Sequence, residues 1–460
     1  MTMVFEQIYL GCLAQASYLI GSEGAAVIVD PRRDVDEYLE RAQELGLTIT
    51  GVLLTHVHAD FVAGHTELAA RTGATIRMSH RAECGFPCEP LRDGDTIELG
   101  HVGIDVIETP GHTPTDLCFL VRDRTALDRP AKLLSGDTLF LGDVGRPDLV
   151  GSAGHTAADM AAMMFESLHE KLLPLADDVE VYPGHGAGSA CGRNISTERS
   201  STMGQQRLAN HALQPMEQAE FVTNATTGLT PPPPYFSHAA SLNRAGPRLI
   251  EELPPMAELG LAEALARQGA GAQLLDPRAA AAYGEAHIAG AINIGLSGQF
   301  ESWCGTLLDL GAPIVLTTAD QASAAEARTR LARVGLEDVV GYTLISAGDI
   351  DSTGRLPQLG VGDLREALAS GDWQVIDVRR PMEYETSHVP GAVHAPVHTL
   401  ATDTGAVAHL DRAAPTAVIC GSGYRSSAAA HFLRGAGFQQ LHNVEGGTNA
   451  WISAELPVEQ

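Results

Sequence analysis

The sequence lacks long apolar runs and is short of positive charge. None of its uninterrupted hydrophobic stretches reaches the roughly 20 residues that a membrane-spanning helix needs. Its 30 Lys and Arg residues are outnumbered by 57 Asp and Glu residues, so the formal net charge at pH 7 is -27. Such a charge disfavours nucleic acid and anionic membrane surfaces as partners. We therefore expect neither a nucleic-acid-binding protein nor a membrane protein.

We also expect neither a leader segment nor a disulfide framework. The N-terminus has no basic segment followed by an apolar core, which a secretory signal peptide requires. The seven cysteines are odd in number and scattered, at positions 12, 84, 88, 118, 191, 304 and 420. Scattered thiols are typical of a reducing compartment, so we expect a cytoplasmic protein.

The chain has enough hydrophobic residues to form several domains. Hydrophobic residues make up 44% and charged residues 19%, which is typical of a soluble globular protein, and 460 residues exceed one ordinary core. The run Pro231–Pro234 cannot continue a helix or a central strand and marks a linker. A second break is expected near residues 351–357. We predict domains over residues 1–235, 245–350 and 358–460.

The two C-terminal segments resemble each other. Leu274–Arg278 matches Val375–Arg379, and His287–Ala291 matches His388–Ala392. An apolar strand and an Ala-rich helix follow at nearly the same offset in both copies. A repeat of this length, with strand and helix alternating, predicts two copies of one α/β domain.

The N-terminal segment carries potential metal ligands where strands are expected to end. His56, His58 and Asp60 follow the apolar run 51–54, so a buried strand would deliver them together at its carboxyl end. Three further candidates, each in a glycine-containing turn after an apolar strand, are His112, Asp137 and His185. Four ligand-bearing turns in one segment predict a metal site, and imidazole with carboxylate suits Zn or Fe.

This ordered series resembles the metallo-β-lactamase superfamily, an αββα sandwich, over about residues 1–235. The likeness is greatest to persulfide dioxygenases and glyoxalase II-type hydrolases. The hydrolases have a histidine after the last aspartate of the motif, which helps to bind a second metal, and Phe61 stands at that position here. A phenyl ring cannot coordinate, so the resemblance implies one metal. The resemblance to the dioxygenases implies that iron is bound by His56, His112 and Asp137, with open coordination positions for substrate and O2.

The same resemblance suggests roles for further residues. Those expected to orient the ligands or the substrate are His58, Asp60 and His185. A weak second metal at His58 and His185 is the alternative. Arg146 resembles an arginine near the substrate of the dioxygenases, or it forms an internal salt bridge with Asp148. Tyr182 either forms a hydrogen bond near the iron or belongs to the core.

Three cysteines of this segment have weaker patterns. Cys84 and Cys88, with His80, have a loose metal-like spacing. Because no second pair of this kind is present, we interpret them as unpaired loop thiols. Cys191 either lines the metal site and interacts with a persulfide or is an ordinary buried residue, which is the simpler interpretation.

In the last segment Cys420 lies between the apolar strand 416–419 and a helix. The loop that follows it consists of Gly421, Ser422, Gly423, Tyr424, Arg425 and Ser426. Its backbone N–H groups, Arg425 and the helix N-terminus are expected to stabilise a thiolate or persulfide and to bind an anion such as thiosulfate or sulfite. A phosphatase would place Cys and Arg in the same way.

The wider pattern resembles a single-domain rhodanese over about residues 358–460. The motifs that carry this likeness are Asp377–Arg379, Glu383–Tyr384, His388–Ala392 and Glu445–Trp451. In the middle copy, alignment on the apolar strand places Thr317 at the position of Cys420 and Ala322 at that of Arg425. A hydroxyl cannot carry a persulfide, so an inactive rhodanese-like domain is predicted there.

The whole chain resembles bacterial persulfide dioxygenase–rhodanese fusions. This implies one Fe(II) per chain and oxidation of a low-molecular-weight thiol persulfide by O2 to sulfite. It also implies a sulfurtransferase that forms or consumes thiosulfate through a Cys420 persulfide, in sulfide detoxification. A homo-oligomer, dimer or tetramer, is expected. The alternatives are a Zn-dependent glyoxalase II-like thioester hydrolase fused to a rhodanese, and a non-catalytic sulfur relay or sensor.

Overall fold

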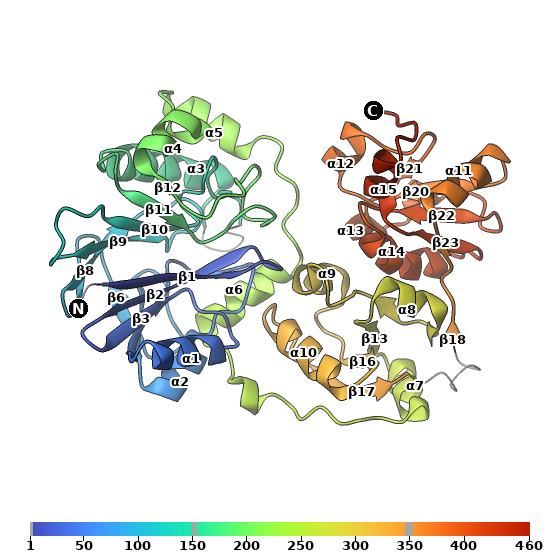
Figure 1. The fold of residues 1–460 in the computed structure, drawn as a ribbon, viewed down its shortest axis with the longest axis horizontal. Helices are drawn as coiled ribbons and strands as arrows, with labels where there is room; N and C mark the ends of the chain where they lie inside the picture. The colour runs from blue at the N-terminus through green and yellow to red at the C-terminus, as the bar shows by residue number, and fades with distance from the viewer. Residues whose placement is uncertain (1–2, 150–153, 346–352) are drawn as a thin grey trace. The chain divides into compact units, whose positions relative to one another are not determined.

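The chain folds into two compact units (Figure 1). The computed structural model describes residues 3–149, 154–345 and 353–460. The first unit contains residues 1–253 with 332–335, and the second contains residues 254–331 and 336–460. No helix in the described ranges is long and apolar enough to cross a membrane. The predicted end of the middle domain at residue 350, and the start of the break at residue 351, fall outside the described residues.

Within the described residues, the first unit contains two six-stranded sheets. The first has the order β1-β2-β3-β4-β5-β6 and consists of β1 (Val4–Leu10), β2 (Gln15–Ser22), β3 (Ala25–Val29), β4 (Thr48–Leu53), β5 (Thr75–Ser79) and β6 (Glu89–Leu91). The second has the order β12-β11-β10-β9-β8-β7 and consists of β7 (Thr96–Leu99), β8 (Val102–Glu108), β9 (Leu117–Asp123), β10 (Lys132–Gly136), β11 (Glu180–Pro183) and β12 (Ser201–Thr202). The helices are α1 (Asp36–Glu44), α2 (His65–Thr72), α3 (Ala157–Glu166), the π-helix η1 (Ser167–Leu172), α4 (Met203–Ala209), η2 (His211–Leu213), α5 (Gln218–Thr226), α6 (Tyr235–Ala245) and η3 (Ile250–Glu252).

Alternating side chains of the strands build three apolar layers. In β2, Tyr18 and Ile20 lie in the core between the sheets, whereas Leu19 lies in the core under α1 and α2. In β9, Phe119 faces the same inter-sheet core, and Leu120 faces the core under α3 and α5. Successive side chains of a strand point to opposite faces, so each sheet buries both of its faces. The predicted αββα sandwich is confirmed.

The described residues of the second unit form two parallel sheets. The first has the order β15-β13-β16-β17 and consists of β13 (Gln273–Asp276), β15 (Ile292–Asn293), β16 (Ile314–Thr318) and β17 (Val339–Leu344). The second has the order β19-β23-β22-β20-β21 and consists of β19 (Gln358–Leu359), β20 (Gln374–Asp377), β21 (Val393–His394), β22 (Thr416–Ile419) and β23 (Leu441–Val444). A short ladder pairs β14 (His287–Ile288) with β18 (Thr353–Gly354). The helices are α7 (Leu261–Gly269), α8 (Ala280–Glu285), α9 (Phe300–Leu307), α10 (Gln321–Ala332), α11 (Val361–Ala369), α12 (Pro381–Thr386), α13 (Val397–Leu400), η5 (Gly405–Val407), α14 (Tyr424–Gly435) and α15 (Gly447–Ser453).

The internal repeat extends to individual side-chain contacts. The rings of Tyr283 and His287 stack with centroids 3.7 Å apart, and those of Tyr384 and His388 stack at the same distance. Each tyrosine hydroxyl donates to a backbone oxygen eight residues further on, at 2.8 Å and 2.7 Å respectively. Two copies of one α/β domain are therefore confirmed.

The strand pairing of the two copies shows which residues are equivalent. In the middle copy Leu275 pairs with Leu316 across two parallel strands. The counterpart of Leu275 in the last copy is Ile376, which pairs with Val418 in the same way. Leu316 of β16 is therefore equivalent to Val418 of β22.

This equivalence corrects the sequence alignment by one residue. Two positions beyond Val418 lies Cys420, and two positions beyond Leu316 lies Thr318. The prediction that Thr317 stands at the cysteine position was wrong, because two uniformly apolar strands can be aligned in more than one register. Thr318 is also a hydroxyl residue, so the middle copy still has no thiol at this position.

Candidate metal and cysteine sites

Three buried side chains converge beyond the ends of strands in the first unit. Ligand atoms of His56, His112 and Asp137 lie within 4.8 Å of one another. The three residues follow β4, β8 and β10, so three separate loops meet here. The structure thus brings together the three residues that the sequence predicts as metal ligands.

Hydrogen bonds leave one nitrogen of each imidazole available to a metal. Nδ1 of His112 donates to the backbone oxygen of Arg146 at 2.9 Å, which leaves its Nε2 for the cluster. Nδ1 of His56 lies 2.9 Å from the Thr55 hydroxyl, and its Nε2 is buried without a hydrogen-bond partner. Burial, and then the neighbouring His58, hold the pKa of His56 well below its usual value, so the ring is neutral. A neutral, buried, unpaired imidazole nitrogen fits a metal ligand.

The third member of the cluster, Asp137, is held by His185. Nδ1 of His185 lies 2.8 Å and 3.1 Å from the two carboxylate oxygens. Burial opposes ionisation of Asp137, but the positive charge of His185 outweighs it and lowers the pKa of the carboxyl. The carboxylate is therefore charged, as a ligand must be. A side chain at Gly145 would collide with the backbone oxygen of Asp137, so the turn requires glycine there.

A second group of ligand-type side chains adjoins the first. Asp60, His185 and Cys191 also place ligand atoms within 4.8 Å of one another. Nε2 of His185 lies 2.7 Å from the Asp60 carboxylate, so this ring bridges Asp60 and Asp137. Burial, followed by the two carboxylates, raises the pKa of the Cys191 thiol. Cys191 is buried, as the simpler interpretation expects, and its sulfur also belongs to this second group of ligand-type side chains.

His58 turns toward Asp30, a residue that the sequence did not single out. Its Nε2 lies 2.9 Å from the Asp30 carboxylate, which also accepts the backbone N–H and the hydroxyl of Thr55, both at 2.8 Å. Burial disfavours the charged ring, but Asp30 outweighs this and raises the pKa of His58. Asp30 has a left-handed φ of 50°, and such strain in a residue other than glycine is frequent at functional sites.

Phe61 lies beside the histidines, and helix α6 holds its loop. Its ring is fully buried, with its centroid 4.4 Å from that of His58 and 6.5 Å from that of His185. Nδ2 of Asn243 donates to the backbone oxygens of His58 at 2.8 Å and of Phe61 at 2.7 Å. Oδ1 of Asn243 accepts the backbone N–H of Ala63 at 2.8 Å. The sequence carried no signal for Asn243, since 182 residues separate it from Phe61.

Replacing Asn243 with alanine tests this support. Three buried backbone groups lose their partner, and each costs roughly 1 kcal/mol or more, so the free energy of unfolding should fall by about 3 kcal/mol. Urea denaturation of the metal-free protein measures it. Ser241→Ala is the control, because this exposed hydroxyl of α6 bonds only within the helix. Equal stability of the two variants would contradict the assigned role.

Replacing Phe61 with histidine tests the number of metals. A new imidazole beside Asp60, His185 and Cys191 completes a four-ligand set of the kind that zinc prefers. Bound metal, measured by plasma mass spectrometry, should therefore rise from one to two per chain. Phe61→Leu, which adds no ligand, should stay at one. Two metals in the unchanged protein would show that Phe61 does not limit the site.

The two predicted substrate-binding residues have other partners. The guanidinium of Arg146 makes two bonds of 2.7 Å to the carboxylate of Asp148. The hydroxyl of Tyr182 donates to Glu180 at 2.9 Å, and its ring packs at the edge of the inter-sheet core. For Arg146 these contacts favour the alternative prediction of an internal salt bridge, and for Tyr182 they favour the alternative prediction of a core residue. Arg146 still contributes to the site through its backbone oxygen, which orients His112.

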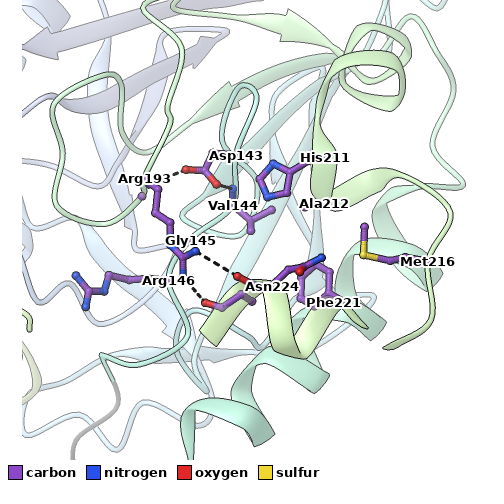
Figure 2. A pocket seen from close by; sticks show the side chains of 12 residues that line it. Asp143, Val144, Gly145, Arg146, Arg193, His211, Ala212, Met216, Phe221 and Asn224 are labelled. Carbon is purple, nitrogen blue, oxygen red and sulfur yellow. Dashed lines mark hydrogen bonds between the residues drawn. The ribbon is translucent and has the colours of Figure 1, made fainter. Parts of the chain in front are cut away.

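A pocket adjoins the metal cluster at the Gly145 turn (Figure 2). It is lined by Asp143, Val144, Gly145, Arg146, Gly192, Arg193, His211, Ala212, Met216, Phe221, Asn224 and Ala225. In Figure 2 the Arg146 side chain points away from the other lining residues, whereas Arg193 reaches the backbone oxygens of Asn224 and Ala225. None of the cluster ligands lines it, and its arginines are paired within the protein.

In the second unit, the sulfur of Cys420 is fully buried between β22 and α14. The backbone N–H of Gly423 donates to it at 3.2 Å. The Ser426 hydroxyl donates to Oδ1 of Asn443 at 2.6 Å, and its oxygen lies 3.4 Å from the sulfur. Gly423 has φ of 90°, and a side chain there would press on the backbone oxygen of Val444. Among the described contacts the sulfur therefore accepts one backbone N–H, rather than the series of N–H groups that the sequence led us to expect.

Arg425, at the start of α14, is held by an acid. Its guanidinium makes two bonds of 2.6 Å to the Glu383 carboxylate. A bidentate pair of this kind fixes the orientation of the guanidinium as well as its position. The same strand register makes Arg425 equivalent to Ser323 of the middle copy, so the prediction of Ala322 at this position was wrong. The middle copy therefore lacks the arginine as well as the cysteine of the loop.

The middle copy contacts the Cys420 loop within the second unit. The Tyr424 hydroxyl donates to the backbone oxygen of Gly295 at 2.6 Å. The Trp303 ring lies 5.8 Å from the guanidinium carbon of Arg425, within range of a cation–π interaction. The copy that lacks a cysteine at the loop position therefore helps to hold the loop of the copy that has one there.

Comparisons with known proteins agree with this division. A model of the metallo-β-lactamase superfamily matches residues 10–185. The crystal structure of a metallo-β-lactamase from Staphylococcus aureus subsp. aureus COL is similar to 75% of this chain and 99% of that one, with 33% identity and a TM-score of 0.67. The chain belongs to the metallo-β-lactamase superfamily. Its C-terminal region adds two rhodanese-like domains, matched over residues 261–343 and 361–454.

Two other proteins that are similar to the metallo-β-lactamase domain carry different names. A hydroxyacylglutathione hydrolase from Polaromonas sp. is 34% identical over 189 residues, which cover 40% of this chain and 66% of that protein. The crystal structure of ETHE1 from Myxococcus xanthus is 28% identical, with a TM-score of 0.46, and covers 53% of this chain and 99% of that chain. The chain is thus a metalloenzyme of the metallo-β-lactamase superfamily joined to a rhodanese.

Proposed function

We propose that the metallo-β-lactamase domain is a mononuclear non-haem Fe(II) dioxygenase. Its proposed reaction converts a low-molecular-weight thiol persulfide, O2 and water into the thiol, sulfite and two protons. The observation that carries the proposal is Phe61, which stands where the glyoxalase II-type motif that this chain resembles has a metal-binding histidine. Two imidazoles and one carboxylate at a single metal are the ligand set of non-haem iron oxygenases.

The residues of the chain fit such a metal. His56 presents an unpaired Nε2, His112 has its Nε2 3.5 Å from the Asp137 carboxylate, and Asp137 adds a charged oxygen. Iron held there would supply open coordination positions for the substrate sulfur and for O2. Asp60 and His185 maintain the charge and orientation of Asp137.

We propose further that the last domain transfers sulfur through Cys420. The Cys420 thiol takes the terminal sulfur of a persulfide, which leaves as the free thiol, and Cys420 becomes a persulfide. Sulfite then accepts that sulfur to give thiosulfate, and the Cys420 thiol is restored. The same two steps in reverse would deliver sulfur from thiosulfate to a thiol. Joining the domains in one chain raises the effective concentration of sulfite at the second reaction.

Sulfide detoxification is the role that we infer from this pair of reactions. The partners are then a low-molecular-weight thiol persulfide, O2, sulfite and thiosulfate, and we infer a homo-oligomer. Tyr424 and Arg425, at the mouth of the loop, face the middle domain, so that domain takes part in positioning the acceptor.

Oxygen uptake by defined metal forms tests the proposal. Protein loaded anaerobically with Fe(II) and given glutathione persulfide should consume one O2 for each sulfite or thiosulfate formed when air is admitted, and protein loaded with Zn(II) should consume none. Sulfite and thiosulfate are quantified together in the same reaction. An iron-free protein that is fully active on a thioester, with no O2 uptake in the iron form, would overturn the dioxygenase.

A zinc-dependent thioester hydrolase is the second candidate. Two observations favour it, namely the 34% identity to a hydroxyacylglutathione hydrolase and the second ligand cluster of Asp60, His185 and Cys191. A hydroxyacyl thioester of glutathione is its test substrate, with hydrolysis followed by release of the free thiol. A non-catalytic sulfur relay would be inactive in both assays yet carry a labelled sulfur on Cys420.

A further inference from the structure

The fold brings together two thiols of the loop between β5 and β6. The Sγ atoms of Cys84 and Cys88 lie 2.9 Å apart, and both residues are free cysteines. A disulfide bond is about 2.0 Å long, so roughly 0.9 Å of movement separates this pair from one. The sulfur of Met78, which is buried, lies 3.2 Å from that of Cys84. The sequence interpretation as unpaired loop thiols missed this contact.

Contacts on both sides of the loop keep the two sulfurs adjacent. The backbone N–H of Gly85 donates to the backbone oxygen of Arg244 at 2.8 Å, at the end of α6. The Phe86 ring packs against His65 with centroids 4.6 Å apart. Glu83, Gly85 and Pro87 are exposed, and both cysteines are partly exposed, so a small thiol compound can reach them.

The surroundings of the pair favour sulfur chemistry over metal binding. His80, which the sequence suggested as a third ligand, pairs with the Glu108 carboxylate at 3.1 Å. Neither of the clusters of His, Cys, Asp and Glu found in the described residues includes Cys84 or Cys88. Two adjacent thiols without a third ligand of this kind are the arrangement of a dithiol–disulfide couple.

We propose that Cys84 and Cys88 form a dithiol site that removes sulfane sulfur from a thiol persulfide and closes into a disulfide. The Cys88 thiol attacks the outer sulfur of the persulfide, whose inner sulfur leaves with the rest of the molecule as the free thiol, and Cys88 becomes a persulfide. Cys84 then attacks the sulfur bonded to the Cys88 Cβ. The Cys84–Cys88 disulfide forms, and hydrosulfide leaves with the Cys84 proton as hydrogen sulfide.

The electrons balance within these two steps. One persulfide is reduced to a thiol and hydrogen sulfide, while two protein thiols are oxidised to one disulfide, and added dithiol returns the pair to its reduced form. Burial, and then the adjacent Cys88 thiol, raise the pKa of Cys84 to about 12, so Cys84 is a poor first nucleophile and the first attack is assigned to Cys88. The choice of a persulfide as the oxidant rests on the proposed function.

Trypsin isolates this site in a single peptide. Cleavage after Arg81 and Arg92 releases residues 82–92, which contain both cysteines and no other cleavage site. Reduced full-length protein is treated with glutathione persulfide without O2, alkylated and digested. The peptide should lose two hydrogens and escape alkylation, with hydrogen sulfide released in equal amount. Cys84→Ser should instead keep one additional sulfur on Cys88, and Cys88→Ser should show neither change.

Controls separate this site from the oxidation reaction. Cys12→Ser, in another loop, should form the same disulfide as the unchanged protein. If the peptide stays fully alkylated while the aerobic protein oxidises persulfide, the dithiol site is overturned and the dioxygenase stands. If the disulfide forms but no O2 is consumed in air, the dithiol site stands and the dioxygenase fails. Retention of Cu(I) by the reduced pair with no disulfide after persulfide treatment would also overturn the site.

Discussion

Cys420→Ser is expected to reduce thiosulfate formation from persulfide and sulfite by about 10⁴-fold or more, the scale of losing a covalent nucleophile. A serine hydroxyl is not ionised near neutral pH and does not carry sulfane sulfur. The loop should keep its shape, because Thr318 shows that this scaffold accepts a hydroxyl residue at the end of the equivalent strand. Thiosulfate is measured by chromatography after incubation with both substrates.

The same variant tests whether O2 uptake and thiosulfate formation occur at separate sites. O2 uptake by Cys420→Ser should equal that of the unchanged protein, and sulfite should accumulate in place of thiosulfate. Cys304→Ala, which removes another buried thiol of the second unit, serves as the control and should form thiosulfate normally. Loss of both activities in Cys420→Ser would contradict the division of labour between the domains.

Asp137→Asn is expected to lower bound iron and O2 uptake by at least about 100-fold, the upper range for disturbing the partners of a ligand. The amide removes the only anionic ligand of the cluster and leaves the charge of His185 balanced by Asp60 alone. Iron per chain is measured by plasma mass spectrometry and O2 uptake with an oxygen electrode.

The control for Asp137→Asn changes Asp105, an aspartate of the same sheet that lies outside the cluster. Asp105→Asn removes a carboxylate that pairs with Arg122 on the neighbouring strand, and it should retain iron and activity. Sulfur transfer by Cys420 should continue in Asp137→Asn when sulfite and persulfide are supplied. Full iron content and full O2 uptake in this variant would exclude Asp137 as a ligand.

Local sequence patterns were enough to predict the strands and the turns that carry the candidate ligands, and resemblance to a known family implied the αββα architecture. Alternating apolar residues such as Leu19 and Ile20 specify opposite faces of one strand, and each ligand follows directly after a strand. Because strand ends of a sheet meet at one edge, residues far apart in the chain could be assigned to a single site. The internal repeat likewise follows from matching short motifs.

Contacts between distant segments could not be predicted in this way. Asn243 holds the loop of Phe61 across 182 residues, and no residue near Asn243 signals that loop. The alignment that makes Thr318 of the middle copy equivalent to Cys420 of the last copy depends on strand pairing, since the apolar runs alone allow a shift of one residue. Cys191 reaches the metal cluster only because its loop folds back beside His185.

By itself, the sequence determined the internal repeat of two α/β copies, the six candidate ligands and the position of Cys420 between a strand and a helix. These depend on periodicity and on motifs within a few residues, which set local structure and side-chain direction. The αββα sandwich and the rhodanese-like fold of the copies were implied by resemblance to known families. Only the tertiary structure decided that His58 turns to Asp30, that Arg146 pairs with Asp148, and that Cys84 lies against Cys88. These depend on packing, hydrogen bonds and loop conformation, in which small free-energy differences select one partner among several.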